Sequence, residues 1–109
     1  MPTDETKAVL DHHNEMLMAG DTDGVMGDYT EDSVFISNFG GVVKGLDAIR
    51  GVFAAAPAGG IPGFEDGVKH VDGEIAFVTW HAEGIALGTD TFVVRDGKIA
   101  AQTVVLHLA

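Results

Sequence analysis

The chain has 109 residues, of which 46% are hydrophobic and 21% are charged, as is ordinary for one globular domain with a single core. Its net charge is −11, and a surface this acidic repels phosphate backbones and anionic lipids. We therefore expect a single domain over residues 1–109, with no nucleic-acid partner and no membrane partner. The opening MPTDETK is too acidic for a secretory signal, so we expect a cytoplasmic protein. The absence of cysteine excludes disulfides and thiolate chemistry.

A first helix is predicted from about Asp4 to Ala19, where apolar residues recur at helical spacing. It contains two adjacent histidines, which cannot face the same way. With about 100° of rotation per residue, Val9 and Leu17 lie roughly 40° to either side of His13. His12 lies at the edge of this apolar stripe. We predict that His13 points into the core.

The rest of the chain is predicted to form short helices followed by antiparallel strands. A second helix is expected from Asp21 or Thr22 to Tyr29 and a third over residues 46–56, after which PAGGIPGF breaks the chain. The Asp-Gly pairs in VDGE and RDGK are strong hairpin signals. The predicted strands lie near Ser33–Ser37, in GGVVKG, and near Phe64–Val71, Glu74–Glu83, Ala86–Arg95 and Lys98–His107. This order predicts an α+β domain with helices on one face of a curved antiparallel sheet.

The last predicted strand is apolar on both faces. One face carries Ile99, Ala101, Thr103, Val105 and His107, and the other carries Ala100, Gln102, Val104, Leu106 and Leu108. A half-exposed antiparallel strand would alternate apolar with polar residues. Since the helices cover only one face, we expect a second copy of the chain to cover the other, giving a homodimer. The alternative is an outer face that is merely hydrophobic.

Three stretches, GDTDGVMGDYTEDSVFI, VVKGLDAIRGVF and DTFVVRDGKIAAQTV, follow one another in the order found in a known family. Together they resemble the nuclear transport factor 2-like superfamily, especially its SnoaL-like and ketosteroid-isomerase-like branches. The resemblance covers nearly the whole chain. It implies a cone-shaped, cystatin-like α+β barrel in which three N-terminal helices close over the concave face of the sheet and enclose an apolar pocket. It also implies dimers through the outer face, but it fixes no function, because the fold hosts isomerases, polyketide cyclases, dehydratases, epoxide hydrolases and binding proteins.

The resemblance to ketosteroid isomerase assigns candidate catalytic residues. The pocket aspartate of that family corresponds to Asp90, and the resemblance implies a protonated carboxyl that donates to an oxyanion. The family's tyrosine on the first helix corresponds to His13, which can act as an acid, a base or a donor. The family's catalytic base corresponds to Ser37, which has no carboxylate, so any proton transfer falls to His13 or Asp90. The alternatives are a strand-end acid that meets water or a turn amide, and a core histidine satisfied by one partner.

Strand parity and the resemblance also give candidates for ligand binding. Trp80, the only tryptophan, can stack on a flat ligand or serve as plain core. Gln102 is a polar group in an apolar row, so it is either a ligand contact or bonded to His13 or Asp90. Asp28 is expected at the surface, with a histidine partner as the alternative. The complete set of expected ligand-binding residues is Met16, Tyr29, Asn38, Val78, Trp80, Phe92, Gln102, Val104 and Leu106.

Two functions are compatible with this sequence. The first is a cofactor-independent isomerase, cyclase or dehydratase that acts on a small apolar carbonyl compound by acid–base catalysis. The second is a non-catalytic ligand-binding or protein-interaction dimer, which the missing carboxylate at Ser37 and the short PAGGIPGF connection favour. We expect no metal site, because the remaining histidines lie on separate elements without the i, i+4 spacing of a helical metal pair.

Overall fold

The computed structural model describes residues 2–55 and 61–109. Its elements are α1 (Pro2–Ala19), α2 (Thr22–Met26), β1 (Val34–Ser37), β2 (Gly41–Lys44), α3 (Leu46–Ala54), β3 (Glu65–Asp72), β4 (Ile75–Ala82), β5 (Ile85–Arg95) and β6 (Lys98–Leu108). The strands form one sheet in the order β2-β1-β6-β5-β4-β3, in which only β1 and β6 pair in parallel. The predicted α+β class is confirmed. Residue 56, the predicted end of the third helix, and residues 57–60 of PAGGIPGF lie outside the described residues.

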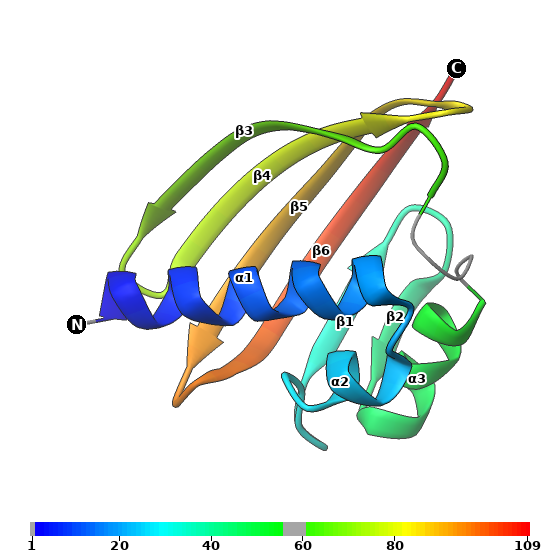
Figure 1. Cartoon of the computed structure of the whole chain (residues 1–109). Coiled ribbons are helices and arrows are strands. Elements are labelled where there is room, and N and C mark those ends of the chain that lie inside the picture. The colour runs from blue at the N-terminus through cyan, green and yellow to red at the C-terminus, as the bar shows by residue number, and fades with distance from the viewer. Residues whose placement is uncertain (1, 56–60) are drawn as a thin grey trace.

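The helices lie on one side of the sheet (Figure 1). α1 runs across the concave face of the long strands, and α2 and α3 lie together beside the short strands β1 and β2. Within the described ranges no pairing joins the edge strands β2 and β3. The sheet is therefore a curved, open cone with the helices over its concave face, as the resemblance implied. A cluster of buried side chains joins α1, α2 and α3 to the concave face.

α1 turns one face toward the sheet. Its buried residues are Thr6, Val9, Leu10 and His13, at the spacing of one helix face. His13 is only 2% exposed, whereas His12 is exposed, so the predicted inward histidine is confirmed. The helix begins at Pro2, earlier than predicted, and proline suits the first turn because its missing N–H has no helical partner there.

Both predicted Asp-Gly turns close hairpins and also anchor α1. Asp96 and Gly97 have φ angles of 52° and 72°, as a type I′ hairpin turn requires. The Glu5 carboxylate accepts a hydrogen bond from the Gly97 N–H. The Thr6 hydroxyl donates to the Gly73 carbonyl oxygen over 2.7 Å. The first turns of α1 are thus tied to two hairpin turns, which fixes the helix across the sheet.

The second helix is shorter than predicted. α2 ends at Met26 and not at Tyr29, because Gly24 and Gly27 lower its helix propensity. Its last residues instead form turn bonds, from the Tyr29 N–H to the Met26 carbonyl oxygen. The early end lets the Tyr29 side chain enter the interior, where it is buried.

One strand residue lies on the opposite face from the one predicted. The register changes between the pairs Val93–Ala101 and Val94–Ile99, which inserts one extra residue into β6. Such a bulge shifts the alternation of side chains by one position. Ile99 is therefore fully buried and does not share the outer face with Ala101.

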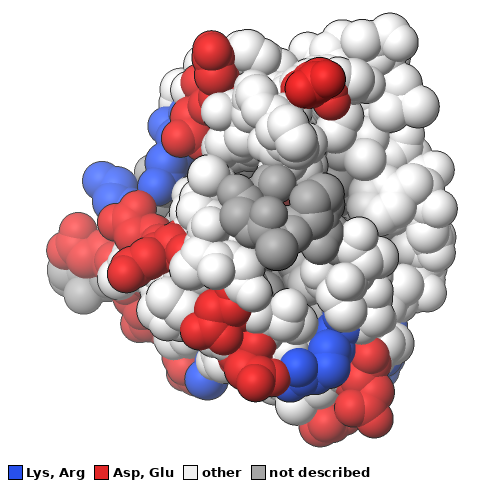
Figure 2. Space-filling view, turned by 45° about the vertical axis from the view of Figure 1, so that its right-hand side comes forward, with Lys and Arg blue, Asp and Glu red and all other residues white. Residues whose placement is uncertain are grey.

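The convex face of the sheet is left uncovered by the described elements. Ile36, Phe77 and Val105 on this face are 43%, 39% and 42% exposed. Thr91 lies between Phe77 and Thr103 in the same cross-strand row. Figure 2 shows acidic side chains on one part of the surface and a broad area, at the right of the view, without charged side chains. Of the apolar residues predicted on the outer face of the last strand, Val105 is exposed there, whereas Ile99 is buried.

Candidate functional site

A chain of hydrogen bonds joins four segments on the concave side of the sheet. The Tyr29 hydroxyl donates to Gln102 Oε1, and Gln102 Nε2 donates to Asp90 Oδ2 over 2.8 Å. The indole N–H of Trp80 donates to the other carboxylate oxygen, Oδ1, over 2.9 Å. Asp90 is 9% exposed, and Tyr29 and Gln102 are more deeply buried. We call these four residues the Asp90 network.

The strand register brings the Asp90 network together. Gln102 on β6 lies opposite Phe92 on β5, and Trp80 on β4 lies opposite Gly88 on β5. Asp90 stands midway between Phe92 and Gly88, so it is the diagonal neighbour of both donors. Diagonal pairs on one face of a sheet lie within reach of long and aromatic side chains. The network therefore follows from strand parity, which placed Asp90 and Phe92 on the pocket side.

Asp90 is flanked by apolar side chains, while its two carboxylate oxygens accept hydrogen bonds. Val78 and Val104 lie directly opposite it on the two neighbouring strands, and both are at least partly buried. Burial raises the pKa of Asp90, and the hydrogen bonds from Trp80 and Gln102 counteract part of that rise. Two N–H donors favour the ionised carboxylate. This geometry suits a carboxylate that accepts, unlike the protonated donor that the resemblance implied.

His13 lies in a box of aromatic rings. Its ring centroid lies 5.9 Å from that of Tyr29, 5.7 Å from that of Phe53 and 5.6 Å from that of Phe92, all in edge-to-face arrangements. Its Nδ1 is buried and has no hydrogen-bond partner among the described residues. Burial, aided by the nearby His12, lowers the pKa of His13 to about 4, so the ring is neutral at pH 7. The alternative of a core histidine satisfied by one partner does not hold for Nδ1 in the described structure.

His13 and Asp90 share a neighbourhood without a hydrogen bond between them in the described residues. Phe92 packs on His13 and lies two residues from Asp90 on the same face of β5. Tyr29 also contacts the His13 ring and donates into the Asp90 network. Burial raises the pKa of Tyr29 well above its ordinary value, and the negative charges of Asp90 and Asp28 add to the rise. Tyr29 is therefore a neutral link between the two candidate catalytic groups.

The position of the family's catalytic base is inside the fold but carries no acid. Ser37 is buried and pairs with Val104 in the parallel ladder of β1 and β6. Its hydroxyl accepts a hydrogen bond from the Gly40 N–H over 2.9 Å. The described geometry thus offers a turn-stabilising serine where a carboxylate base would stand.

The remaining candidates for ligand binding divide into interior and peripheral residues. Val104 is buried, and Leu106 is partly buried against the core. Met16 is partly buried and packs closely against Gly24 of α2. Asn38 is exposed, and its side chain bonds both the N–H and the carbonyl oxygen of Leu106. Asn38 and Met16 are not part of the Asp90 network in the described structure.

Asp28 differs from its expected place at the surface. It is 7% exposed, and His12 Nδ1 lies 2.8 and 2.9 Å from its two carboxylate oxygens. This pair fastens the middle of α1 to the segment after α2, so the alternative of a histidine partner is the correct one. The sequence gives no signal for it beyond the presence of both residues, because the separation of 16 positions follows from how the helices fold back.

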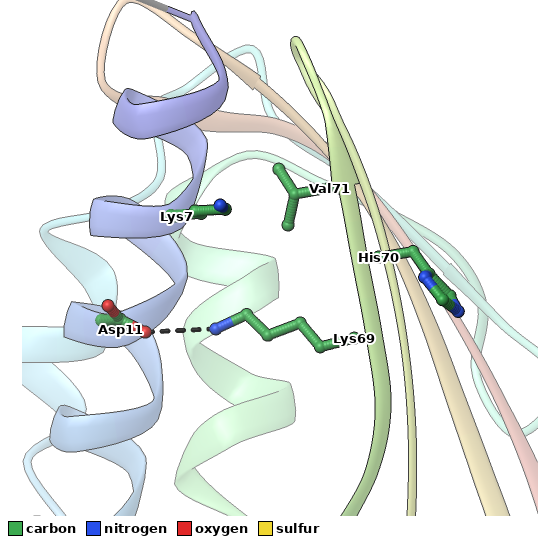
Figure 3. Close-up of a pocket in the computed structure, with 5 residues that line it drawn as sticks. All are labelled: Lys7, Asp11, Lys69, His70 and Val71. Atoms are coloured by element: carbon green, nitrogen blue, oxygen red, sulfur yellow. Dashed lines mark hydrogen bonds and ion pairs between the residues drawn. The ribbon is translucent and has the colours of Figure 1, made fainter.

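A groove of about 420 Å³ lies away from these residues, between α1 and the edge strand β3. Figure 3 shows Lys7 and Asp11 on α1 facing Lys69 and Val71 on β3, with His70 turned to the other side of the strand. Lys69 Nζ lies 3.1 Å from Asp11 Oδ1. The pair is largely exposed, and such surface pairs contribute little to stability. None of the Asp90 network lines this groove.

Residues 2–55 and 61–109 contain no group of three or more histidine or acidic side chains able to hold a metal ion. No helix in the same ranges is both long and apolar enough to cross a bilayer.

Comparison with known families agrees with this geometry. Residues 10–102 match the family model described as a SnoaL-like domain, a span that includes α1 from Leu10, the whole Asp90 network and the first part of β6. The chain belongs to the SnoaL-like domain family. No curated protein sequence matches it significantly.

Several solved structures share the fold of this SnoaL-like domain. A nuclear transport factor 2-like protein of unknown function from Burkholderia xenovorans is 19% identical with a TM-score of 0.83, and the match covers 100% of this chain and 88% of that one. A proposed ketosteroid isomerase from Kribbella flavida is 16% identical with a TM-score of 0.80, covering 98% and 81%. A proposed polyketide cyclase from Sinorhizobium meliloti is 21% identical with a TM-score of 0.73, covering 89% and 93%. At these identities the likeness establishes the fold alone.

Proposed function

We propose that this SnoaL-like domain binds a small apolar carbonyl compound on the concave side of the sheet and moves a proton on it without a cofactor. The observation that carries the proposal is a buried carboxylate, Asp90, whose oxygens are each held by one N–H donor. It is accompanied by a neutral histidine, His13, with an unpaired buried Nδ1. Perturbed titratable groups of this kind gather at functional sites. The reaction class is isomerisation, cyclisation or dehydration.

The proposed chemistry gives each group one role. Asp90 takes the proton from the carbon next to the carbonyl. The electron pair of the broken C–H bond forms a C=C bond, and the carbonyl π pair moves to oxygen, which gives an enolate. His13 stabilises that oxygen by hydrogen bonding. In an isomerisation Asp90 then returns the proton to a different carbon of a conjugated enolate, so that the carbon–carbon double bond shifts and the carbonyl re-forms. A carboxylate whose pKa is raised by burial is a stronger base than a free one, which suits proton abstraction near neutral pH. The catalytic residues are thus Asp90 and His13.

Solvent exchange of protons on simple ketones tests this role. The protein is incubated in D₂O with acetophenone or 2-cyclohexenone, and loss of the α-proton signal is followed by proton NMR. We expect exchange above the buffer rate for the unaltered chain, and a fall of roughly 100-fold or more for Asp90→Asn. Asp28→Asn is the matched control, because Asp28 is a buried carboxylate outside the Asp90 network, and it should keep the full rate.

Two results would count against the proposal. If folded Asp90→Asn exchanges ketone protons as fast as the unaltered chain, Asp90 is not the base. If neither ketone exchanges while both bind unchanged, the SnoaL-like domain is a binding protein of the same fold, as the missing carboxylate at Ser37 suggests.

A second proposal concerns the convex face: we infer that two copies of the chain pair through it. The exposed apolar residues Ile36, Phe77 and Val105 lie on a part of the sheet whose neighbours are threonines. Elsewhere a chain of net charge −11 repels its own copies, so an uncharged apolar face is the most favourable place for self-association. The pairing would leave the concave side of each copy free for its own ligand.

A further inference from the structure

Trp80 occupies a place that only a glycine on the neighbouring strand allows. A Cβ built on Gly88 would lie 2.2 Å from Trp80 Cε2 and 2.5 Å from Cζ2, closer than real Cβ atoms come to other heavy atoms. The φ angle of Gly88 lies outside the left-handed region, so its backbone would accept any residue. The indole ring, not the backbone, therefore requires glycine at position 88.

This close approach sets the direction of the indole N–H. Gly88 lies directly opposite Trp80, and Asp90 is two residues further along the same strand. With its six-membered ring over Gly88, the indole carries Nε1 to within 2.9 Å of Asp90 Oδ1. Phe64 packs against the same indole at a centroid distance of 5.4 Å. Two neighbours thus hold the ring where its N–H meets the carboxylate.

The indole N–H can only donate. It therefore stabilises a carboxylate oxygen that accepts and cannot serve one that donates. Gln102 holds the second oxygen, while its own amide is oriented by Tyr29. The two donors come from opposite sides, on β4 and β6, and fix the plane of the carboxylate between them. A tryptophan that served only as packing would have no need of this alignment.

We propose that Trp80 is a positioning residue: its indole N–H orients the Asp90 carboxylate and favours the ionised form. We further propose that position 88 is glycine because any side chain there would collide with the indole. This inference rests on the proposed role of Asp90 as a base. The sequence alone does not indicate a role for Gly88, because a glycine within a strand marks a close approach by another group without identifying that group. The strand register identifies that group as Trp80, which pairs with Gly88.

The test uses the protein without substrate. Trp80 is the only tryptophan, so its fluorescence reports this site alone. We expect a step in its emission as pH is lowered through the protonation of Asp90, and loss of that step in Asp90→Asn. In parallel, carbon-13 NMR of the aspartate carboxyls follows the Asp90 midpoint directly. Trp80→Phe keeps a ring but removes the N–H, so the Asp90 midpoint should move to higher pH.

Glycine variants supply the second arm. Gly88→Ala should displace the indole, change its emission and move the Asp90 midpoint in the same direction as Trp80→Phe. Gly51→Ala is the matched control, because a Cβ there meets nothing within 4 Å, and both readouts should stay unchanged. If Gly88→Ala does not fold, the Asp90 midpoint in Trp80→Phe alone tests the positioning role of Trp80.

An unchanged Asp90 midpoint in folded Trp80→Phe would overturn the inference and leave Trp80 as packing. This result is independent of the proposed function, since ketone exchange could still depend on Asp90. Conversely, a shifted midpoint without any ketone exchange would keep the positioning role and reject the catalytic one.

Discussion

The two faces of the sheet are built from alternate residues of the same strands, yet one is buried under helices and the other is exposed. On the concave face, helices exclude water, and the polar groups of the Asp90 network meet partners of fitting geometry. On the convex face, threonines and apolar side chains remain exposed, and no charge lies among Ile36, Phe77 and Val105. A buried polar group is stable only with its partners, whereas an exposed one is solvated by water. Substitutions on the two faces should therefore differ in cost even at adjacent positions.

The largest expected difference is between Gln102 and its neighbour Thr103. Gln102→Leu removes the donor to Asp90 Oδ2 and the acceptor of the Tyr29 hydroxyl, leaving a buried charge and a buried hydroxyl short of partners. We expect a loss of about 3 to 5 kcal/mol in the free energy of unfolding, measured by urea denaturation. Thr103→Val, on the exposed face, should change it by less than about 1 kcal/mol. Equal costs for the two variants would contradict the contrast between the faces.

The second prediction concerns acid stability and His13. Its pKa is lowered to about 4 in the folded chain, below its unfolded value near 6.5, so the unfolded state binds the proton more tightly. The contribution of neutral His13 to the free energy of unfolding is fully present above pH 6.5. It is lost as pH falls through the folded pKa, and the total loss is about 3 kcal/mol. His13→Phe, which fits the aromatic box, should lack this loss in denaturation curves between pH 7 and pH 4.

His107→Gln is the control for this titration, since His107 is exposed and lies on a different element from His13. It should keep the acid-side loss of stability. If His13→Phe loses stability on acidification as steeply as the unaltered chain, His13 is not the buried neutral group described here.

A charge placed on the convex face should separate the two copies of the proposed dimer. Phe77→Glu puts a charge into the proposed dimer interface, where the acidic partner would repel it. We expect the dimer dissociation constant to rise about 100-fold, or about 2.7 kcal/mol. Sedimentation should show a mass near that of one chain, 11.4 kDa. Met18→Glu, a substitution of a similarly exposed apolar residue on α1, should leave the dimer intact, and a monomeric unaltered chain would reject the proposed pairing.

The smallest expected effect is the direction in which the stability of Asp90→Asn, relative to the unaltered chain, changes with pH. The pKa of Asp90 is raised in the fold, so its contribution to stability is fully present below its unfolded pKa and is lost as pH rises through the folded pKa. Asp90→Asn cannot titrate. Its stability relative to the unaltered chain should therefore increase as pH rises from 3 to 7, as measured by thermal unfolding at each pH. A relative stability that falls over this range would mean that the fold favours the charged carboxylate more than burial opposes it.

Much of the fold could be predicted because its signals are local. Asp96 and Gly97 fix one hairpin through their φ angles, and Gly73 supplies the positive φ of the other. Helical periodicity alone places His13 inward. Strand parity likewise places Asp90 and Phe92 on one buried face. For Gln102 the sequence left two alternatives, a ligand contact or a bond to His13 or Asp90, and the described structure has the bond to Asp90.

The parts that the sequence could not predict depend on contacts between distant segments. Asp28 is buried because α1 brings His12 against it, and nothing near Asp28 in the chain indicates that approach. The bulge beside Ile99 moves a side chain to the opposite face, and alternation of residue types cannot reveal an inserted position. The fit of Trp80 over Gly88 needs the strand register to within one residue.

The most direct test of the central claim, that the concave side is the ligand site, is to map where a small ketone binds. Nitrogen-15 and carbon-13 NMR spectra of the labelled protein would be recorded as 2-cyclohexenone is added. We predict that the largest shifts centre on Asp90, Phe92, Gln102 and the Trp80 indole N–H, and that Asp90→Asn weakens them. Shifts confined to the groove of Lys7, Asp11 and Lys69, or to the convex face, would contradict the account.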